Sequence, residues 1–212
     1  MTATVRWRAS VPSGSELRSI KQSALYHAAA QAFLKNGYHG TTLDDIAAAL
    51  GVKKATLYYY VRNKQELLVQ CHMAASDATE EIPGRIPKVG LSGLQKLELA
   101  LHDYLESLLG EESSNLIVIE ESALTPENYT KVIARRDEFQ AVLMGYVREG
   151  LVDGSVAPCD PKLALFAILG GINWTQKWYR SDGPWSVRKI ADGIVKQMIR
   201  SIAAKPDKAL PA

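Results

Sequence analysis

The 212-residue chain has little cysteine and no long hydrophobic run. Cys71 and Cys159 lie far apart without a C-x-x-C spacing, which argues against a disulfide framework or a zinc site and favours a reducing compartment. No run of 18 apolar residues is present, and residues 1–14 lack the apolar core of a signal peptide. We therefore expect a cytoplasmic protein without a membrane span.

The sequence also lacks a recognisable catalytic motif. It contains no paired acid and base, no nucleophile elbow and no G-x-G-x-x-G phosphate loop. The histidines are scattered over four distant positions: His27, His39, His72 and His102. We therefore predict neither an enzyme nor a cofactor or metal site.

The net charge of +2 conceals an asymmetry along the chain. Residues 1–72 carry nine basic and four acidic residues, whereas residues 73–212 carry 16 basic and 19 acidic residues. A basic excess is typical of a surface that contacts a polyanion. Only the N-terminal part is therefore expected to bind nucleic acid.

Residues 42–64 have the pattern of a helix-turn-helix. Thr42 and Asp45 can form a capping box for a first helix, and Gly51 stands where that helix must stop. The apolar residues Ile46 and Leu57 are spaced to pack the two helices together. Such a motif presents its second helix to the major groove of DNA.

The second helix is predicted over Lys54–Tyr60 and ends in three tyrosines, residues 58–60. Successive helical side chains point about 100° apart, so at least one tyrosine must reach solvent or a partner. Asn63 is a predicted N-cap for a third helix, with Glu66 at the capping-box position. Lys64, on the first turn, would suit a phosphate group.

The rest of the chain predicts an all-α protein of about nine helices, because no segment alternates with a period of two. We expect a flexible arm over residues 1–14, a first helix over Glu16–Asn36, and a long helix from Asn63 to Glu81 that is broken by Ile82–Pro87. Five amphipathic segments follow: Leu91–Gly110, Ser114–Ala123, Pro126–Val152, Pro161–Arg180 and Ser186–Ala203.

Residues 17–70 resemble the N-terminal domain of the TetR family of bacterial transcription regulators. The matching segments are AAAQAFLKNGY (28–38), TTLDDIA (41–47) and GVKKATLYYYVRNKQEL (51–67). Val61 stands where the family usually has phenylalanine, and Lys53 where serine is common. The resemblance and the side-chain chemistry together indicate these DNA contacts: Thr42, Lys53, Lys54, Ala55, Thr56, Tyr58, Tyr59 and Lys64. We expect the tyrosine hydroxyls and Lys64 to bind phosphates, and Lys53, Lys54 and Thr56 to read base edges.

The segment GGINWTQKWYR (170–180), followed by Ser186 and by Ile190–Asp192, is similar to the penultimate and last helices of a TetR subgroup. That subgroup includes repressors of steroid and fatty-acid catabolism that respond to acyl-CoA thioesters. The apolar stripe of this segment, with Trp174 and Trp178, suits either a helix-bundle dimer interface or the wall of an effector pocket. The candidate effector contacts are Tyr104, Leu108, Arg135, Phe139, Trp174, Lys177, Trp178 and Arg180.

We therefore expect a homodimeric, ligand-responsive DNA-binding regulator, most simply a repressor of a pseudo-palindromic operator that a small hydrophobic or acyl-CoA-type effector releases. The expected domains are 15–62 for DNA binding and 63–204 for effector binding and dimerisation, followed by a tail over 205–212. Two alternatives remain: a small-molecule-binding helical protein with an incidental basic N-terminus, and an architectural DNA binder without ligand control.

Overall fold

The computed structural model describes residues 13–110 and 123–205. These residues form ten helices, three of them only four residues long, and no strand beyond an isolated bridge between Val156 and Ala203. The all-α prediction is confirmed. Outside the described residues lie 1–12 of the predicted arm, 114–122 of one predicted helix and 206–212 of the predicted tail. Ser13 and Gly14 were predicted to belong to the arm, but they are the N-cap and the first residue of the first helix. The helices are α1 (Gly14–Gly40), α2 (Leu43–Ala49), α3 (Lys54–Leu57), α4 (Lys64–Glu80), α5 (Ile82–Arg85), α6 (Gly93–Leu109), α7 (Pro126–Asp153), α8 (Pro161–Asn173), α9 (Thr175–Trp178) and α10 (Val187–Ile202).

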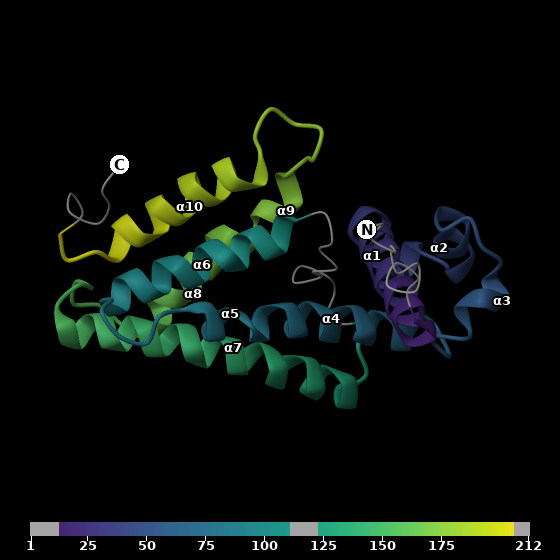
Figure 1. The fold of residues 1–212 in the computed structure, drawn as a ribbon, viewed down its shortest axis with the longest axis horizontal. Coiled ribbons are helices and arrows are strands. Elements are labelled where there is room, and N and C mark those ends of the chain that lie inside the picture. The colour runs from purple at the N-terminus through teal and green to yellow at the C-terminus, as the bar shows by residue number, and fades with distance from the viewer. Residues whose placement is uncertain (1–12, 111–122, 206–212) are drawn as a thin grey trace, which may run out of the picture.

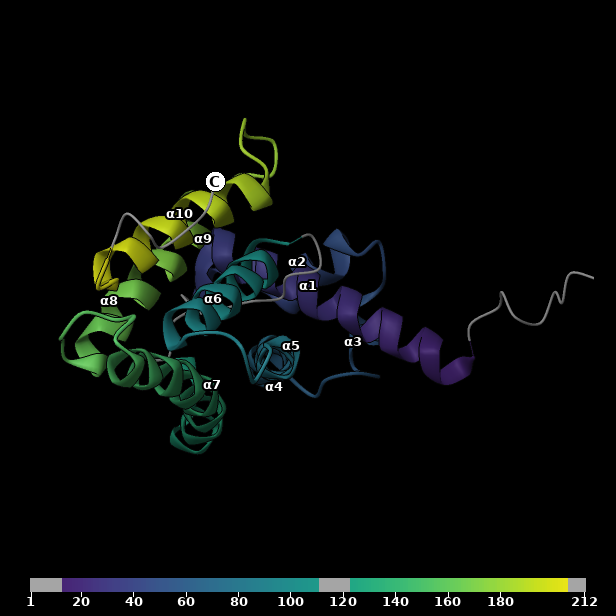
Figure 2. The same ribbon diagram turned by 60° about the vertical axis from the view of Figure 1, so that its left-hand side comes forward.

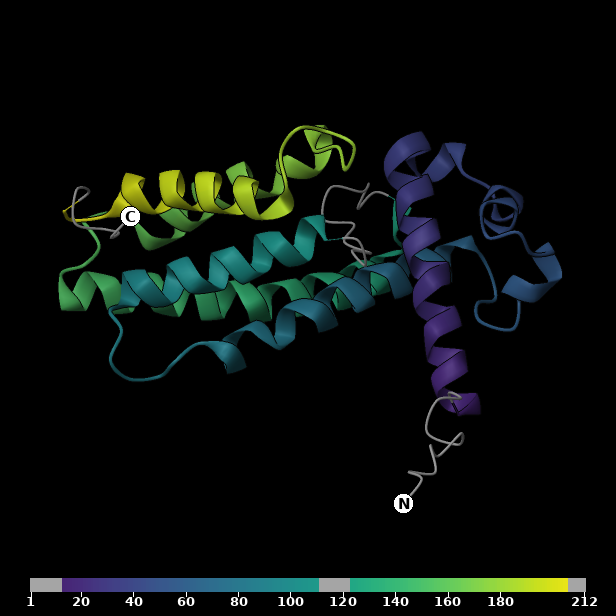
Figure 3. The ribbon, with the colours of Figure 1, turned by 45° about the horizontal axis from the view of Figure 1, so that its top comes forward.

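Helices α1 to α3 and the beginning of α4 form a separate module at one end of the elongated molecule (Figure 1). Helix α1 crosses the N-terminal end of α4, and α2 and α3 lie beyond α1 (Figure 3). A φ of 74° at Gly37 interrupts the helical geometry of α1 where the sequence predicted its end, because glycine adopts this conformation at low cost. The module encloses a hydrophobic core whose largest buried residues are Leu25, Phe33, Ile46, Leu57, Leu67 and Leu68.

The second helix of the motif is shorter than expected. Helix α3 spans only Lys54–Leu57, and Tyr58–Tyr60 follow as turns rather than as three more helical residues. A single turn of helix satisfies few of its own backbone groups. Packing of Leu57 and Val61, each 2% exposed, therefore holds this segment in place.

Helices α5 to α10 form the second module, a bundle around its own core. Helix α6 packs against α7 and α10, and α8 packs against α7 and α10. In the view along α4, helices α6 and α7 lie beside it (Figure 2). The buried residues of α6 include Leu97, Leu101 and Leu105, all 0% exposed.

The predicted end of the long helix is confirmed, because α4 ends at Glu80 with Glu81 as its C-cap. The short helix α5 that follows was not predicted; Pro83 lies in its first turn, where a proline costs no intrahelical hydrogen bond. One predicted boundary further along the chain is wrong. The helix predicted over Pro161–Arg180 is divided at Trp174 into α8 and α9. Helix α9 ends at Trp178, and Tyr179 is already extended.

The N-terminal end of α6 lies extremely close to the C-terminal part of α7. A Cβ atom added at Gly93 would lie 2.1 Å from the backbone nitrogen of Gly150 and 2.5 Å from the carbonyl oxygen of Tyr146. Backbone atoms cannot yield as a flexible side chain can, so only glycine fits at position 93.

We predict that Gly93→Ala lowers the free energy of unfolding by at least about 3 kcal/mol, because the added methyl forces α6 and α7 apart. Gly145→Ala is the matched control, since its Cβ would meet nothing within 4 Å. That control should gain about 0.5–1 kcal/mol from helix propensity. Urea denaturation measures both, and equal stability of the two variants would contradict the prediction.

Candidate DNA-binding surface and effector cavity

The helix-turn-helix is built from caps and a small shared core. Thr42 accepts a hydrogen bond from the backbone N–H of Asp45 at 3.1 Å, and Asp45 accepts from the backbone N–H of Thr42 at 2.8 Å. The hydrogen bonds to Thr42 lower the pKa of the Asp45 carboxyl. The predicted capping box is thus confirmed. Buried Ile46 and Ala47 then fix α2 against the core.

The outer surface of the motif carries most of the predicted DNA contacts. Tyr59 and Tyr58 are 81% and 52% exposed, whereas Tyr60 is half-buried, which confirms that the three tyrosines cannot share one buried face. Lys54 donates to Asp44 of α2 at 2.7 Å across the exposed turn. The other exposed or half-buried members of the predicted set are Thr42, Lys53, Ala55 and Thr56.

Lys64 has an internal position that the sequence did not suggest. Its ammonium group donates to the carbonyl oxygens of Tyr38 and Thr41, both at 2.8 Å, and lies 4.3 Å from the centre of the Tyr38 ring. A lysine has three N–H donors, so one remains for a phosphate. Lys64 therefore ties the first turn of α4 to the end of α1.

The cap of α4 also differs in one detail from the prediction. Asn63 accepts from the backbone N–H of Glu66 at 2.8 Å, as an N-cap should. The Glu66 carboxylate, however, accepts from the backbone N–H of Arg62 at 2.6 Å rather than from that of Asn63. The reciprocal bond is therefore shifted by one residue.

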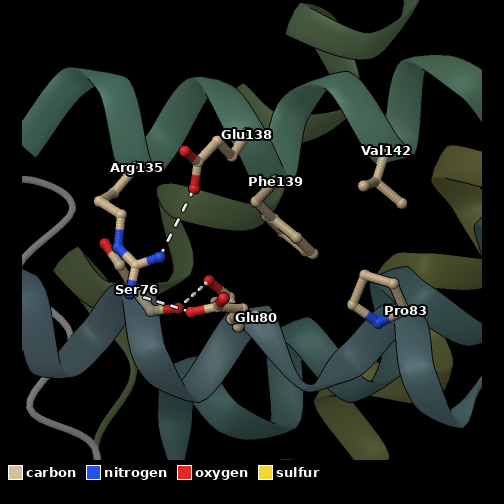
Figure 4. A pocket seen from close by; sticks show the side chains of 8 residues that line it. Ser76, Glu80, Pro83, Arg135, Glu138, Phe139 and Val142 are labelled. Carbon is tan, nitrogen blue, oxygen red and sulfur yellow. Dashed lines mark hydrogen bonds and ion pairs between the residues drawn. The ribbon is translucent and has the colours of Figure 1, made fainter.

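A cavity of about 190 Å³ lies between α4 and α7, with α5 at its edge (Figure 4). Phe139 points from α7 into it, and Arg135 spans from α7 towards α4 at one end. Pro83 and Val142 close the opposite end. The remaining lining residues are Ser76, Thr79, Glu80 and Glu138.

A smaller cavity of about 40 Å³ lies next to the first and reaches Tyr104 of α6. Both cavities are lined by Ser76, Thr79 and Phe139, so they adjoin each other at these residues. The Phe139 and Tyr104 rings lie 5.2 Å apart, and the Tyr104 hydroxyl donates to Asn173 of α8 at 2.8 Å. Burial raises the pKa of Tyr104, so it stays a neutral hydrogen-bonding group.

The structure divides the eight predicted effector contacts into three groups. Tyr104, Arg135 and Phe139 line the two cavities beside α4. Leu108 and Arg180 instead line an open cleft of about 1080 Å³ between α1 and the ends of α6, α9 and α10. Lys177 and the two tryptophans line none of these three cavities.

The exposure of those tryptophans has a simple cause. Trp174 and Trp178 lie on the outer side of α8 and α9, 62% and 40% exposed, because Leu165, Ile168 and Ile172 form the inner side. The α4 residues Ser76, Thr79 and Glu80 were not among the predicted contacts. In the sequence, polar residues that follow an apolar stripe look like ordinary surface residues. Nothing therefore marked these three as residues that line a cavity.

Comparison with known proteins agrees with this geometry. Residues 25–71 match the family model described as bacterial regulatory proteins, tetR family, and residues 90–202 match that of the tetracyclin repressor-like C-terminal domain. The chain belongs to the TetR family of bacterial transcription regulators. The first match covers most of α1, all of α2 and α3 and the beginning of α4, which is the module that carries the helix-turn-helix. Among the described residues, no helix is both long and apolar enough to cross a membrane.

Several relatives are described by function. The fatty acid metabolism regulator protein of Bacillus subtilis is 24% identical over 87% of this chain and 97% of its own length. The transcriptional repressor KstR2 of Rhodococcus jostii is 26% identical over 88% of this chain and 93% of its own. The structure of AibR with isovaleryl coenzyme A and operator DNA is 28% identical, covers 84% of this chain and 97% of that chain, and has a TM-score of 0.71.

We predict that Tyr59→Phe weakens binding to every DNA duplex by about tenfold, because a hydroxyl bound to a charged phosphate contributes about 1.5 kcal/mol. The unfolding midpoint should not change, since Tyr59 is 81% exposed. Tyr129→Phe, at an exposed tyrosine of α7, is the control. Fluorescence anisotropy with several duplexes measures the effect. A loss confined to one sequence would mean that Tyr59 reads a base instead.

Proposed function

We propose that the protein is a homodimeric repressor that a hydrophobic effector, of the acyl-CoA class, releases from DNA. The observation that carries this proposal is the path of α4. One helix begins at Lys64, bound to the DNA module, and ends at Glu80, beside the cavity. Seventeen helical residues span about 25 Å, so a shift at the cavity reaches the DNA module as a tilt.

On DNA, each subunit places the segment from Lys53 to Tyr59 at a major groove. The contacts are the set predicted from the sequence: Thr42, Lys53, Lys54, Ala55, Thr56, Tyr58, Tyr59 and Lys64. Two-fold symmetry then requires a pseudo-palindromic operator with half-sites about one helical turn apart or slightly more. Because its ligand is chromosomal DNA, the regulator acts in the cytoplasm, and it binds its effector without transforming it.

The dimer is proposed to form through α8, α9 and α10. A stripe on the outer side of α8 and α9 is apolar and exposed, and its members are Leu163, Phe166, Ala167, Gly170, Trp174 and Trp178. A continuous exposed apolar face is typical of a protein interface. The glycine on the stripe lets a partner helix approach closely. This assignment also accounts for the two tryptophans outside the cavities.

The proposed effector site consists of the two adjoining cavities that Ser76, Thr79 and Phe139 line together. Their combined volume is smaller than that of most ligand pockets, which suits a short acyl group. Arg135 and Arg136 supply positive charge at the rim. The acyl-CoA class is supported by the resemblance to AibR, whose structure holds isovaleryl coenzyme A.

A thermal-shift assay tests the effector class, because a ligand that binds only the native state raises its stability by about 2.7 kcal/mol at a concentration of 100 times Kd. We expect isovaleryl-CoA to raise the unfolding temperature and to lower the DNA affinity. Coenzyme A and isovalerate separately should do neither. A shift produced by steroids or aromatic drugs but by no CoA thioester would contradict the assignment.

We predict that Phe166→Glu yields a monomer that no longer binds the operator, because it buries a carboxylate in the proposed interface. Val89→Glu, at an exposed apolar residue between α5 and α6, is the control and should remain dimeric. Sedimentation velocity measures the association state. A dimeric Phe166→Glu variant would exclude this face as the interface.

A further inference from the structure

A single guanidinium group joins α7 to α4 beside the larger cavity. Arg135 of α7 contacts Asp77 at 2.7 Å and Glu80 at 2.9 Å, both on α4, and Glu138 of its own helix at 3.5 Å. Its side chain is 29% exposed, whereas each of the three carboxylate side chains is more than 60% exposed. We call Arg135, Asp77 and Glu80 the α4–α7 clasp.

The clasp lies between the DNA module and the effector site. Val132, one helical turn before Arg135, belongs to the hydrophobic core of the DNA module. Phe139, one turn after Arg135, lies in the cavity (Figure 4). A ligand that binds beside Phe139 therefore lies next to the clasp, and the clasp lies between that ligand and the DNA module.

The charges of the clasp are placed unequally on the two helices. Its positive group belongs to α7, and both of its α4 groups, Asp77 and Glu80, are negative. An anion that binds Arg135 is attracted by the guanidinium group of α7, and it is repelled by two carboxylates on α4 but by only one, Glu138, on α7. A ligand shifts a conformational equilibrium only through such a difference in interaction between two states.

We propose that the α4–α7 clasp is the switch that converts effector binding into DNA release. An anionic group of the effector exchanges for Asp77 and Glu80 on the Arg135 guanidinium. The two freed carboxylates are then repelled by that anion, and α4 moves away from α7. This inference rests on the proposed function, and it assigns to Arg135 the coupling of the two sites in addition to effector binding.

The movement reaches the DNA module because Lys64 bonds the other end of α4 to the carbonyl groups of Tyr38 and Thr41. In this mechanism the closed clasp is the DNA-binding state. Opening the clasp by mutation should therefore reproduce the effect of the effector in its absence. In allosteric proteins, binding at one site typically changes the affinity at the other roughly 5- to 150-fold. The clasp must produce a change of this order in the DNA affinity.

The decisive experiment uses the full chain and a DNA duplex that the wild-type protein selects from a random pool. The double variant D77N/E80Q keeps the shape of both side chains and removes their charge. We expect it to bind that duplex at least about fivefold more weakly without any effector. The variant E81Q is the control, because it breaks the exposed Glu81–Arg85 pair just beyond the clasp, and it should bind as the wild type does.

A second measurement tests the exchange step itself. Inorganic pyrophosphate, titrated at constant ionic strength, should bind D77N/E80Q several-fold more tightly than the wild type, because the two α4 carboxylates no longer compete for Arg135. The variant R135Q should show no such binding and should also bind DNA weakly. Circular dichroism and sedimentation confirm that each variant is folded and dimeric.

The outcomes separate the two levels of the proposal. A double variant that binds the selected duplex within twofold of the wild type, or more tightly, would overturn the clasp alone. Equal pyrophosphate binding by D77N/E80Q and R135Q would overturn the exchange step. A wild-type protein that selects no duplex from the pool would overturn the proposed function and the clasp with it.

Discussion

The structure depends on one helix that belongs to two modules. Leu67, Leu68 and Cys71 of α4 are buried in the core of the DNA module, while Ser76 and Thr79 of the same helix line the cavities against α7. A helix transmits displacement because its backbone hydrogen bonds keep it nearly straight over this length. A change in the relative position of the two modules therefore involves α4, together with the beginning of α7, whose Val132 packs in the same core.

The recognition segment shows why that position matters. Helix α3 is a single turn, and the predicted DNA contacts lie on this short, exposed segment. Such a segment has little stability of its own. Its orientation is set by Leu57 and Val61 below it, and through them by α1 and α4. The placement of the predicted DNA contacts therefore depends on where the module is held.

Much of the DNA module could be predicted because its determinants are local. The Thr42–Asp45 capping box, the N-cap at Asn63 and the stop at Gly37 each depend on residues within a few positions of one another. The contacts of Lys64 with Tyr38 and Thr41 could not be predicted, because they join positions 26 and 23 residues apart. The same is true of the α4–α7 clasp, in which Arg135 meets Asp77 across 58 residues of sequence.

By itself, the sequence determined the all-α class, the helix-turn-helix and the basic N-terminal part, since these follow from periodicity, caps and composition. Only the tertiary structure decided which side of each helix faces a cavity, a core or solvent. It placed the side chains of Trp174 and Trp178 on the exposed surface and that of Phe139 in a cavity, although the sequence predicts amphipathic helices for all three. The reason is that burial depends on which helices meet, and helices meet through contacts between residues far apart in the chain.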